Sequence, residues 1–177
     1  MRVQFQQAGF SLLEMMAVIA IIAIISIMGF PLIQNQSHRQ QLDLMAQRFI
    51  LHAQFARQQA MVLNQPVAIS PRLNGVWNLG WKISAGEKIL LEQYSLVPIQ
   101  VEGGGKGSSE AFIDPHLQAP QILFNPSGSA KTKHGGFVAN RLILRHRDAP
   151  KLQRHLILAA SGRWRICDPQ ADRRGCY

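Results

Sequence analysis

The chain has 177 residues, of which 47% are hydrophobic and 16% are charged. Setting aside the first 33 or so residues, which contain one long apolar segment, leaves roughly 140 residues, enough for a single modest globular domain. The sequence contains no internal repeat, which excludes a repeat array. The chain is strongly basic, with a formal net charge of +9 and a pI of about 10.4.

The apolar segment spans residues 10–30, and Glu14 is its only charged residue. At about 1.5 Å of rise per residue, it would form a helix about 30 Å long, enough to cross a bilayer core. A carboxylate at membrane depth is costly unless it is paired, so Glu14 is predicted to have a specific partner. Ala8 and Gly9 precede this segment, so cleavage after Gly9 would leave the helix on the mature protein. The alternative is an ordinary single-pass anchor.

The residues at this junction resemble the prepilin-peptidase site of type IV pilins and type II secretion pseudopilins. Gly9 is followed by Phe10 and, at the fifth mature position, by Glu14. The resemblance implies that Gly9 ends the leader, that Phe10 becomes an N-methylated amino terminus, and that Glu14 pairs with the amino terminus of a neighbouring subunit. Such a pair would compensate the buried charge. One departure from the family is that Arg2 is the only basic residue of the leader, residues 1–9.

A polar stretch with a helical period follows Pro31. Its apolar residues recur at spacings of three and four, which predicts an amphipathic continuation of the helix over residues 34–64. They are Leu42, Met45, Phe49, Ala53, Ala56, Ala60 and Leu63. Asn64, Gln65 and Pro66 would end the helix. Residues 10–33 are expected in the membrane or in a filament core, and residues 34–64 are expected to pack on the head.

From residue 65 onward the pattern changes to short strands separated by glycine and proline. The predicted strands are residues 67–70, 77–84, 89–101, 122–125, 137–147, 153–160 and 163–167. The predicted fold class is α+β and type IV pilin-like, with a long N-terminal helix packed on an antiparallel sheet. Residues 65–177 would form the globular head.

The sequence shows no catalytic or metal-binding pattern, so neither an enzyme activity nor a cofactor is predicted. The six histidines, at positions 38, 52, 116, 134, 146 and 155, include no helical metal-binding pair with a glutamate between. His146, between Arg145 and Arg147, is predicted to be a surface residue. Lys106 lies in a glycine-rich loop, but Gly107 follows it where a phosphate-binding loop needs serine or threonine.

The positive charge is concentrated near the C-terminus. Residues 35–130 contain seven Lys/Arg and six Asp/Glu, a balance of +1, whereas residues 131–177 contain eleven Lys/Arg and three Asp, a balance of +8. Such asymmetry predicts a polyanionic partner for the C-terminal part, either nucleic acid or an anionic surface. The alternative is a soluble basic face with no partner.

The two cysteines, Cys167 and Cys176, have eight residues between them, which is not a zinc spacing. The head of a pilin-like protein faces the periplasm, an oxidising compartment in which disulfides persist. A bridge would close a loop of residues 168–175 and would stabilise the fold by roughly 2–3 kcal/mol. The alternative is two free thiols.

Residues 162–167 are predicted to present two arginines. In a strand, Arg163 and Arg165 would face one way, and Trp164 and Ile166 the other. Trp164 and Ile166 would anchor the strand on the core, while the arginine forks would project into solvent and suit phosphate oxygens. Gly162 would permit the turn that presents them. The alternative is a hairpin with a polar outer face and no ligand.

Residues 162–165 read Gly-Arg-Trp-Arg and resemble the GRxR motif of FimT-type minor pilins. Residues 80–83 and 124–128 resemble a strand motif and a turn motif of the FimT/GspH branch of minor pilins. The resemblance covers nearly the whole chain. It implies binding to DNA during uptake by naturally competent bacteria.

Other basic residues could complete a DNA-binding surface. Those in loops are Lys131, Lys133, Arg173 and Arg174, and those that flank the preceding hairpin are Arg145, Arg147, Lys151 and Arg154. Phosphate neutralisation makes binding salt-dependent and nearly independent of sequence. The sequence has no evident aromatic platform for single-stranded bases, so it predicts backbone contacts to double-stranded DNA.

The sequence is therefore interpreted as a FimT/GspH-type minor pilin that binds DNA non-specifically and supports natural transformation. Expected partners are double-stranded DNA, other pilins in a filament, the prepilin peptidase and the inner membrane. The expected location is single-pass in the inner membrane, with the head in the periplasm, and then in the pilus. The alternatives are a GspH-type pseudopilin with a structural role in a type II secretion filament, and a minor pilin that primes pilus assembly.

Overall fold

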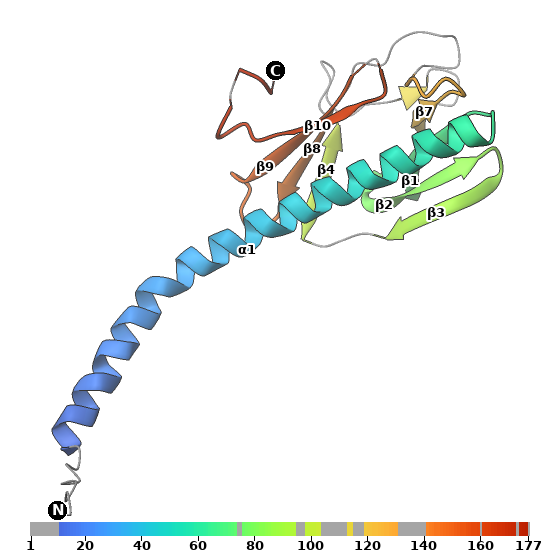
Figure 1. Ribbon diagram of the computed structural model, residues 1–177. Helices are drawn as coiled ribbons and strands as arrows, with labels where there is room; N and C mark the ends of the chain where they lie inside the picture. The colour runs from blue at the N-terminus through green and yellow to red at the C-terminus, as the bar shows by residue number, and fades with distance from the viewer. Residues whose placement is uncertain are drawn as a thin grey trace, which may run out of the picture. The chain divides into compact units, whose positions relative to one another are not determined.

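The computed structural model describes residues 11–73, 76–94, 98–103, 113–114, 119–130, 141–159, 161–172 and 174–176. The chain divides into two compact units, Met1–Ser37 and His38–Tyr177. Helix α1 (Leu12–Val62) begins in the first unit and ends in the second (Figure 1).

The first unit contributes the start of α1. Glu14 lies in the first turn of the helix and is exposed, and its backbone N–H donates to the Ser11 carbonyl at 3.1 Å. Gly9 and Phe10 lie outside the described residues. None of the helical residues that the structure describes form a segment with the length and apolarity that a membrane crossing requires.

The described residues of the second unit form two four-stranded antiparallel sheets and a two-stranded one (Figure 1). The first sheet has the order β3-β2-β1-β7, with β1 (Val67–Leu73), β2 (Val76–Ala85), β3 (Lys88–Tyr94) and β7 (Ile122–Phe124). The second has the order β10-β9-β8-β4, with β4 (Ile99–Gly103), β8 (Arg141–His146), β9 (Gln153–Leu158) and β10 (Trp164–Cys167). The short pair is β5 (Ile113–Asp114) and β6 (Ala119–Pro120). The predicted α+β class is confirmed, with the strands divided between two main sheets rather than one.

The single strand predicted for residues 89–101 is wrong. The chain instead forms β3, which pairs with β2 in the first sheet, and β4, which pairs with β8 in the second. Pro98 lies directly before β4 and has no N–H to donate to a ladder. Its carbonyl accepts a hydrogen bond from the Arg147 backbone N–H at 2.9 Å instead.

The second half of α1 supplies one side of the core. Its buried side chains are Leu42, Met45, Ala46, Phe49, Ala53, Ala56 and Ala60, which confirms all of the predicted apolar face except Leu63. Leu63 is 42% exposed because the helix ends at Val62 and Asn64 turns the chain with a positive φ of 49°. The alanines in the last three turns let the helix lie close to the strands.

Phe49 joins α1 to both main sheets. Its ring makes edge contacts with Trp77 and Trp81 of β2, at centroid distances of 6.3 and 5.1 Å, and with Trp164 of β10 at 5.2 Å. These four rings, here called the aromatic junction, include all three tryptophans of the chain. Trp81 is further fixed by His52, because its Nε1–H donates to His52 Nδ1 at 3.0 Å. Aromatic pairs in this geometry add stabilisation beyond the area that they bury.

His146 is fully buried, so the prediction that it is a surface residue is wrong. Strand alternation places His146 on the same face of β8 as Leu142 and Leu144, toward α1. Its Nδ1 accepts the Asp148 N–H at 3.2 Å, and its Nε2 lies 2.9 Å from Gln41 Oε1 on α1. This arrangement needs the neutral ring, with the proton on Nε2.

Burial lowers the pKa of His52, His146 and His155 below the ordinary value of 6.5. For His146, the neighbouring His38 ring, stacked at 4.1 Å, lowers the pKa further. Below pH 6.5 the unfolded chain therefore binds more protons than the folded one, so stability falls as the solution is acidified.

We expect the melting temperature of residues 38–177 to fall between about pH 7.5 and about pH 5, where histidines titrate and most carboxylates do not. Thermal unfolding followed by circular dichroism measures this. The matched variant His52→Asn keeps an acceptor for Trp81 and removes one titrating ring, so its loss on acidification should be smaller. A melting temperature that stays constant or rises on acidification would contradict this assignment of the histidines.

Candidate functional site

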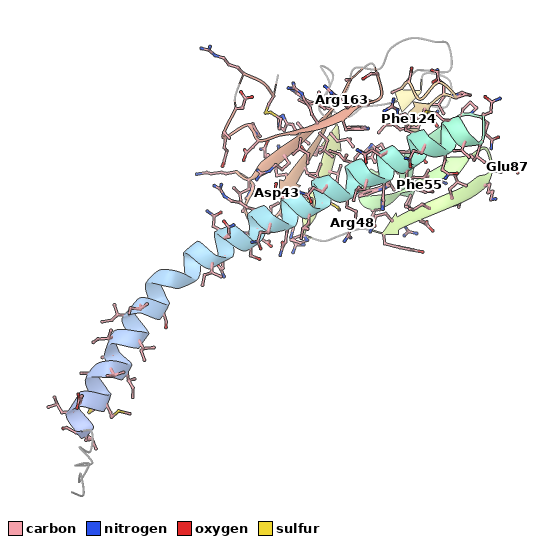
Figure 2. The ribbon with its side chains drawn as sticks, viewed as in Figure 1. Asp43, Arg48, Phe55, Glu87, Phe124 and Arg163 are labelled. Atoms are coloured by element: carbon pink, nitrogen blue, oxygen red, sulfur yellow. A yellow bond between two sulfur atoms is a disulfide. The ribbon has the colours of Figure 1, made fainter. Side chains whose placement is uncertain are left out.

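The hairpin of β9 and β10 presents the two predicted arginines. In this hairpin Trp164 pairs with Leu158, and Cys167 pairs with His155. The Gly162 N–H donates to the Ala159 carbonyl at 2.9 Å, and the Ala159 N–H donates to the Arg163 carbonyl at the same distance. This tight turn places Arg163 at the start of β10 (Figure 2).

Both Arg163 and Arg165 are exposed, as predicted. Trp164 between them is 8% exposed and packs on Phe49, which confirms it as the anchor of the strand. The same prediction for Ile166 is wrong, since Ile166 is 39% exposed. Among the strands that the structure describes, β10 is at the edge of its sheet and pairs with β9 alone, so Ile166 lies beside no strand on its other side.

Gly162 is buried and has a positive φ of 76°. A Cβ at this position would lie 2.5 Å from the Gly128 carbonyl oxygen. That same carbonyl accepts a hydrogen bond from Arg57 Nε of α1 at 2.8 Å. The turn before β10 and the turn after β7 therefore pack against each other without space for a side chain.

The turn after β7 holds its shape through Asn125. Asn125 Oδ1 accepts the Ser129 N–H at 3.0 Å, and the Asn125 carbonyl accepts the Gly128 N–H at 2.8 Å. Residues 124–128 and residues 162–165 were each singled out from the sequence, and the structure places them side by side. The contribution of Arg57 was not predicted, because a bond across 71 residues leaves no local signal.

The guanidinium groups of Arg163 and Arg165 differ in their contacts. Arg165 Nη2 donates to the Gly175 carbonyl. The Arg163 guanidinium makes no hydrogen bond or ion pair with the residues that the structure describes. All N–H donors of the Arg163 guanidinium are therefore available to a ligand, and so are those donors of Arg165 that do not bind the Gly175 carbonyl.

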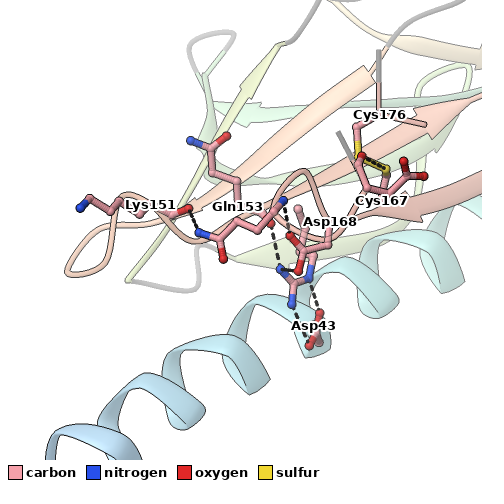
Figure 3. Close-up of polar contacts among 9 residues, drawn as sticks. Asp43, Lys151, Gln153, Cys167, Asp168 and Cys176 are labelled. Atoms are coloured by element: carbon pink, nitrogen blue, oxygen red, sulfur yellow. Dashed lines mark hydrogen bonds and ion pairs between the residues drawn. A yellow bond between two sulfur atoms is a disulfide. The ribbon is translucent and has the colours of Figure 1, made fainter. Parts of the chain in front are cut away.

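Arg154 does not belong to an exposed basic surface, contrary to expectation. It is 8% exposed, and its Nε lies 2.6 Å from Asp43 Oδ1 of α1 while its Nη1 lies 2.9 Å from Asp168 Oδ2 (Figure 3). Strand alternation places Arg154 on the inner face of β9, with Leu156 and Leu158. A buried guanidinium between two carboxylates is compensated, and it connects α1 to the C-terminal part of the chain.

The other predicted basic residues have varied environments. Arg145 and Arg147 pair with Glu102 and Asp148, each at 3.5 Å. Lys151 and Arg174 are exposed. Lys131, Lys133 and Arg173 lie outside the described residues. Within the described part of the chain, no group of three His, Cys, Asp or Glu side chains could hold a metal ion.

The disulfide between Cys167 and Cys176 is formed, with Cα atoms 5.6 Å apart, as predicted. It closes the disulfide loop, residues 168–175. Arg141 lies on the outer face of β8, and its Nη1 donates to the Cys176 carbonyl at 3.0 Å. The C-terminal segment is therefore held on the second sheet by a covalent bond and by arginines of β8 and β10.

We expect Gly162→Ala to destabilise the head by about 1–3 kcal/mol, because alanine disfavours a positive φ and its methyl group would meet the Gly128 carbonyl. Gly86→Ala is the matched control, since Gly86 also has a positive φ of 59° but its Cβ would meet nothing within 4 Å. Urea unfolding should show the larger loss for Gly162→Ala. Equal losses in the free energy of unfolding would mean that the contact between the two turns does not contribute to stability.

The fold is similar to that of two solved structures. One is the type IV minor pilin FimU of Pseudomonas aeruginosa strain PAO1, with a TM-score of 0.55, 15% identity, and coverage of 75% of this chain and 95% of that one. The other is the minor pseudopilin EpsH from the Type 2 Secretion System of Vibrio cholerae, with a TM-score of 0.50, 15% identity, and coverage of 72% and 97%. No curated protein sequence matches the chain. At these identities the similarity shows the fold.

Two family models match the sequence. The prokaryotic N-terminal methylation motif matches residues 4–30, which contain the junction at Gly9 and Phe10. The family described as type II transport protein GspH matches residues 45–173, well over half of the chain. These matches confirm the resemblance to FimT/GspH-type proteins. The chain belongs to the GspH family of minor type IV pilins and pseudopilins.

Proposed function

We propose that this protein is a minor type IV pilin that binds double-stranded DNA without sequence preference and supports DNA uptake in natural transformation. The observation that carries the proposal is the pair of exposed arginines, Arg163 directly before the edge strand β10 and Arg165 on it. Arginine forks fit phosphate oxygens, and two on one edge can follow a nucleic-acid backbone.

The charge around β10 favours a polyanion. Residues 131–177 carry eleven Lys/Arg against three Asp. Two of these carboxylates are already paired, Asp148 with Arg147 and Asp168 with Arg154. Neither of these pairs involves Arg163 or Arg165, so the two arginines keep their charge for a ligand. A positive field of this kind raises the rate at which a polyanion is captured.

The environment of Trp164 supports contact with the backbone rather than with the bases. Trp164 is the aromatic residue of the motif, but it is buried against Phe49 and has no exposed ring face on which a base could stack. Base stacking on aromatic rings is the usual means of holding single strands. Contact through phosphates suits a duplex of any sequence.

The N-terminal motif supports a place in a filament. We infer that the prepilin peptidase cleaves after Gly9, that Phe10 becomes the methylated amino terminus, and that Glu14 pairs with the amino terminus of a neighbouring pilin. The subunit would first lie in the inner membrane with its head in the periplasm, and then in the pilus. There the basic residues of the head would meet incoming DNA. Lys131, Lys133, Arg173 and Arg174 are the further candidates for phosphate contact.

A second function is a structural role in a type II secretion filament. The name of the matching family and the similarity to EpsH favour it. A minor pilin that primes pilus assembly is the related possibility. In both cases the basic residues near β10 would contact an acidic protein neighbour, and binding to DNA would not be needed.

We expect residues 38–177 to shift a DNA duplex in a gel, with an affinity that falls steeply as salt is raised. This fragment contains every residue of the buried core, so it keeps the interactions that stabilise the head. Arg163→Ala/Arg165→Ala should weaken binding of any sequence and reduce the slope of log affinity against log salt by about 2, one unit for each lost phosphate contact.

The matched control is Arg48→Ala/Lys88→Ala, which removes the same charge from exposed positions on α1 and β3. It should retain most of the affinity. If both double variants lose affinity equally, the interaction is a general charge effect and not a site on β10. If the unmodified fragment does not bind, the structural role in a secretion filament becomes the better account.

A further inference from the structure

The disulfide loop, residues 168–175, has a defined internal structure. The Asp168 carbonyl accepts the N–H groups of Ala171 at 3.1 Å and Asp172 at 2.9 Å. Asp172 Oδ1 accepts the Gly175 N–H at 2.8 Å. A Cβ on Gly175 would lie 2.0 Å from Asp172 Oδ2, so this carboxylate occupies the space beside the backbone. The described residues of the loop, 168–172 and 174–175, are therefore folded and do not form a loose tail.

Two arginines of the second sheet hold the end of this loop. Arg165 of β10 and Arg141 of β8 both lie opposite Ile157 of β9, so they are on the same face of the sheet. Arg165 donates to the Gly175 carbonyl, and Arg141 donates to the next carbonyl, that of Cys176, at 3.0 Å. The loop end thus lies across the strand between the two arginines.

The start of the loop is fixed separately. Asp168 pairs with Arg154 at 2.9 Å, and Gln170 donates from its side chain to the Lys151 carbonyl at 2.9 Å (Figure 3). Cys176 is fully buried and Cys167 is 8% exposed, so the disulfide that joins the two ends is shielded from solvent. The disulfide is therefore a permanent structural element of the oxidised protein.

We propose that the disulfide loop is a positioning element of the DNA site, which fixes Arg165 and holds Arg174 beside it. This inference rests on the proposed function. Arg174 is exposed and directly precedes Gly175, the residue whose carbonyl Arg165 binds. Closure of the loop thus holds the backbone of Arg174 next to the acceptor of Arg165, from where its guanidinium would be the third of the site. The ligand of this three-arginine site is a phosphodiester backbone.

The contact with Gly175 orients Arg165 without neutralising it. A carbonyl carries no net charge, and a guanidinium has five donors, so most of them remain for phosphate. Restricting a flexible side chain before binding reduces the entropy lost in the complex. Without the disulfide, the start of the loop would keep its contacts with Arg154 and Lys151, but its end would be held by hydrogen bonds alone. The Gly175 carbonyl would then be a less constant acceptor for Arg165, and Arg174 would be less fixed relative to β10.

The experiment compares duplex DNA binding, measured by fluorescence anisotropy, across four forms of residues 38–177. These are the oxidised parent, Cys167→Ala/Cys176→Ala, Arg174→Ala, and the combination of all three substitutions. We expect the cysteine variant to bind about three- to tenfold more weakly than the parent. Arg174→Ala should weaken binding in the oxidised parent and have little further effect in the cysteine variant, because the two changes act on one site.

The outcomes separate the proposed function, DNA binding, from the positioning role of the disulfide loop. If the oxidised parent does not bind the duplex, both the proposed function and this inference are overturned. Binding by the parent with equal effects of Arg174→Ala in both backgrounds would overturn the inference and leave the proposed function standing. Circular dichroism shows whether the cysteine variant is folded. If it is not, the oxidised Arg174→Ala protein decides, because unchanged binding there would overturn the inference.

Discussion

The architecture of the head depends on the aromatic junction of Phe49 with Trp77, Trp81 and Trp164. A single ring on α1 contacts both main sheets, through β2 on one side and β10 on the other. These two sheets share no ladder between their named strands, so side-chain contacts set their relation: the packing of both sheets against α1, and the hydrogen bond that the Val101 N–H of β4 donates to Asn78 Oδ1 of β2. Because Trp164 belongs to the edge strand β10, the interaction that completes the core also determines where Arg163 and Arg165 are displayed.

Polar contacts with α1 extend this arrangement to the surface. Arg57 binds the carbonyl of Gly128, and Gly162 packs on that same carbonyl, so α1 sets the position of the turn before β10. Farther along the helix, Asp43 pairs with Arg154, which also holds Asp168 at the start of the disulfide loop. The basic residues that remain exposed lie on a turn, a strand and a loop. Each of these three segments is positioned by contacts that lead to α1. If these residues bind DNA as proposed, the contacts would hold the site in place before any ligand arrives, which would favour binding.

Local patterns in the sequence predicted much of this structure. The three- and four-residue spacing of Leu42 to Ala60 marked the buried face of α1, and the position of the two cysteines marked the loop. Features that depend on partners distant in the chain could not be predicted. Arg154 and Asp43 are 111 residues apart, and His146 reads as a surface residue until β8 is placed against α1. Likewise, the break between β3 and β4 is evident only once their partner strands are known, and the exposure of Ile166 reflects the edge position of β10.

The central claim is that the head binds a DNA backbone at β10 and the disulfide loop. It is tested most directly by two-dimensional NMR of labelled residues 38–177 during titration with a short duplex. We expect the shifts to be concentrated at Arg163, Arg165 and Arg174, with the same residues affected by duplexes of unrelated sequence. Shifts concentrated instead on the free edge of the first sheet at β3, or no shifts at low salt, would contradict it.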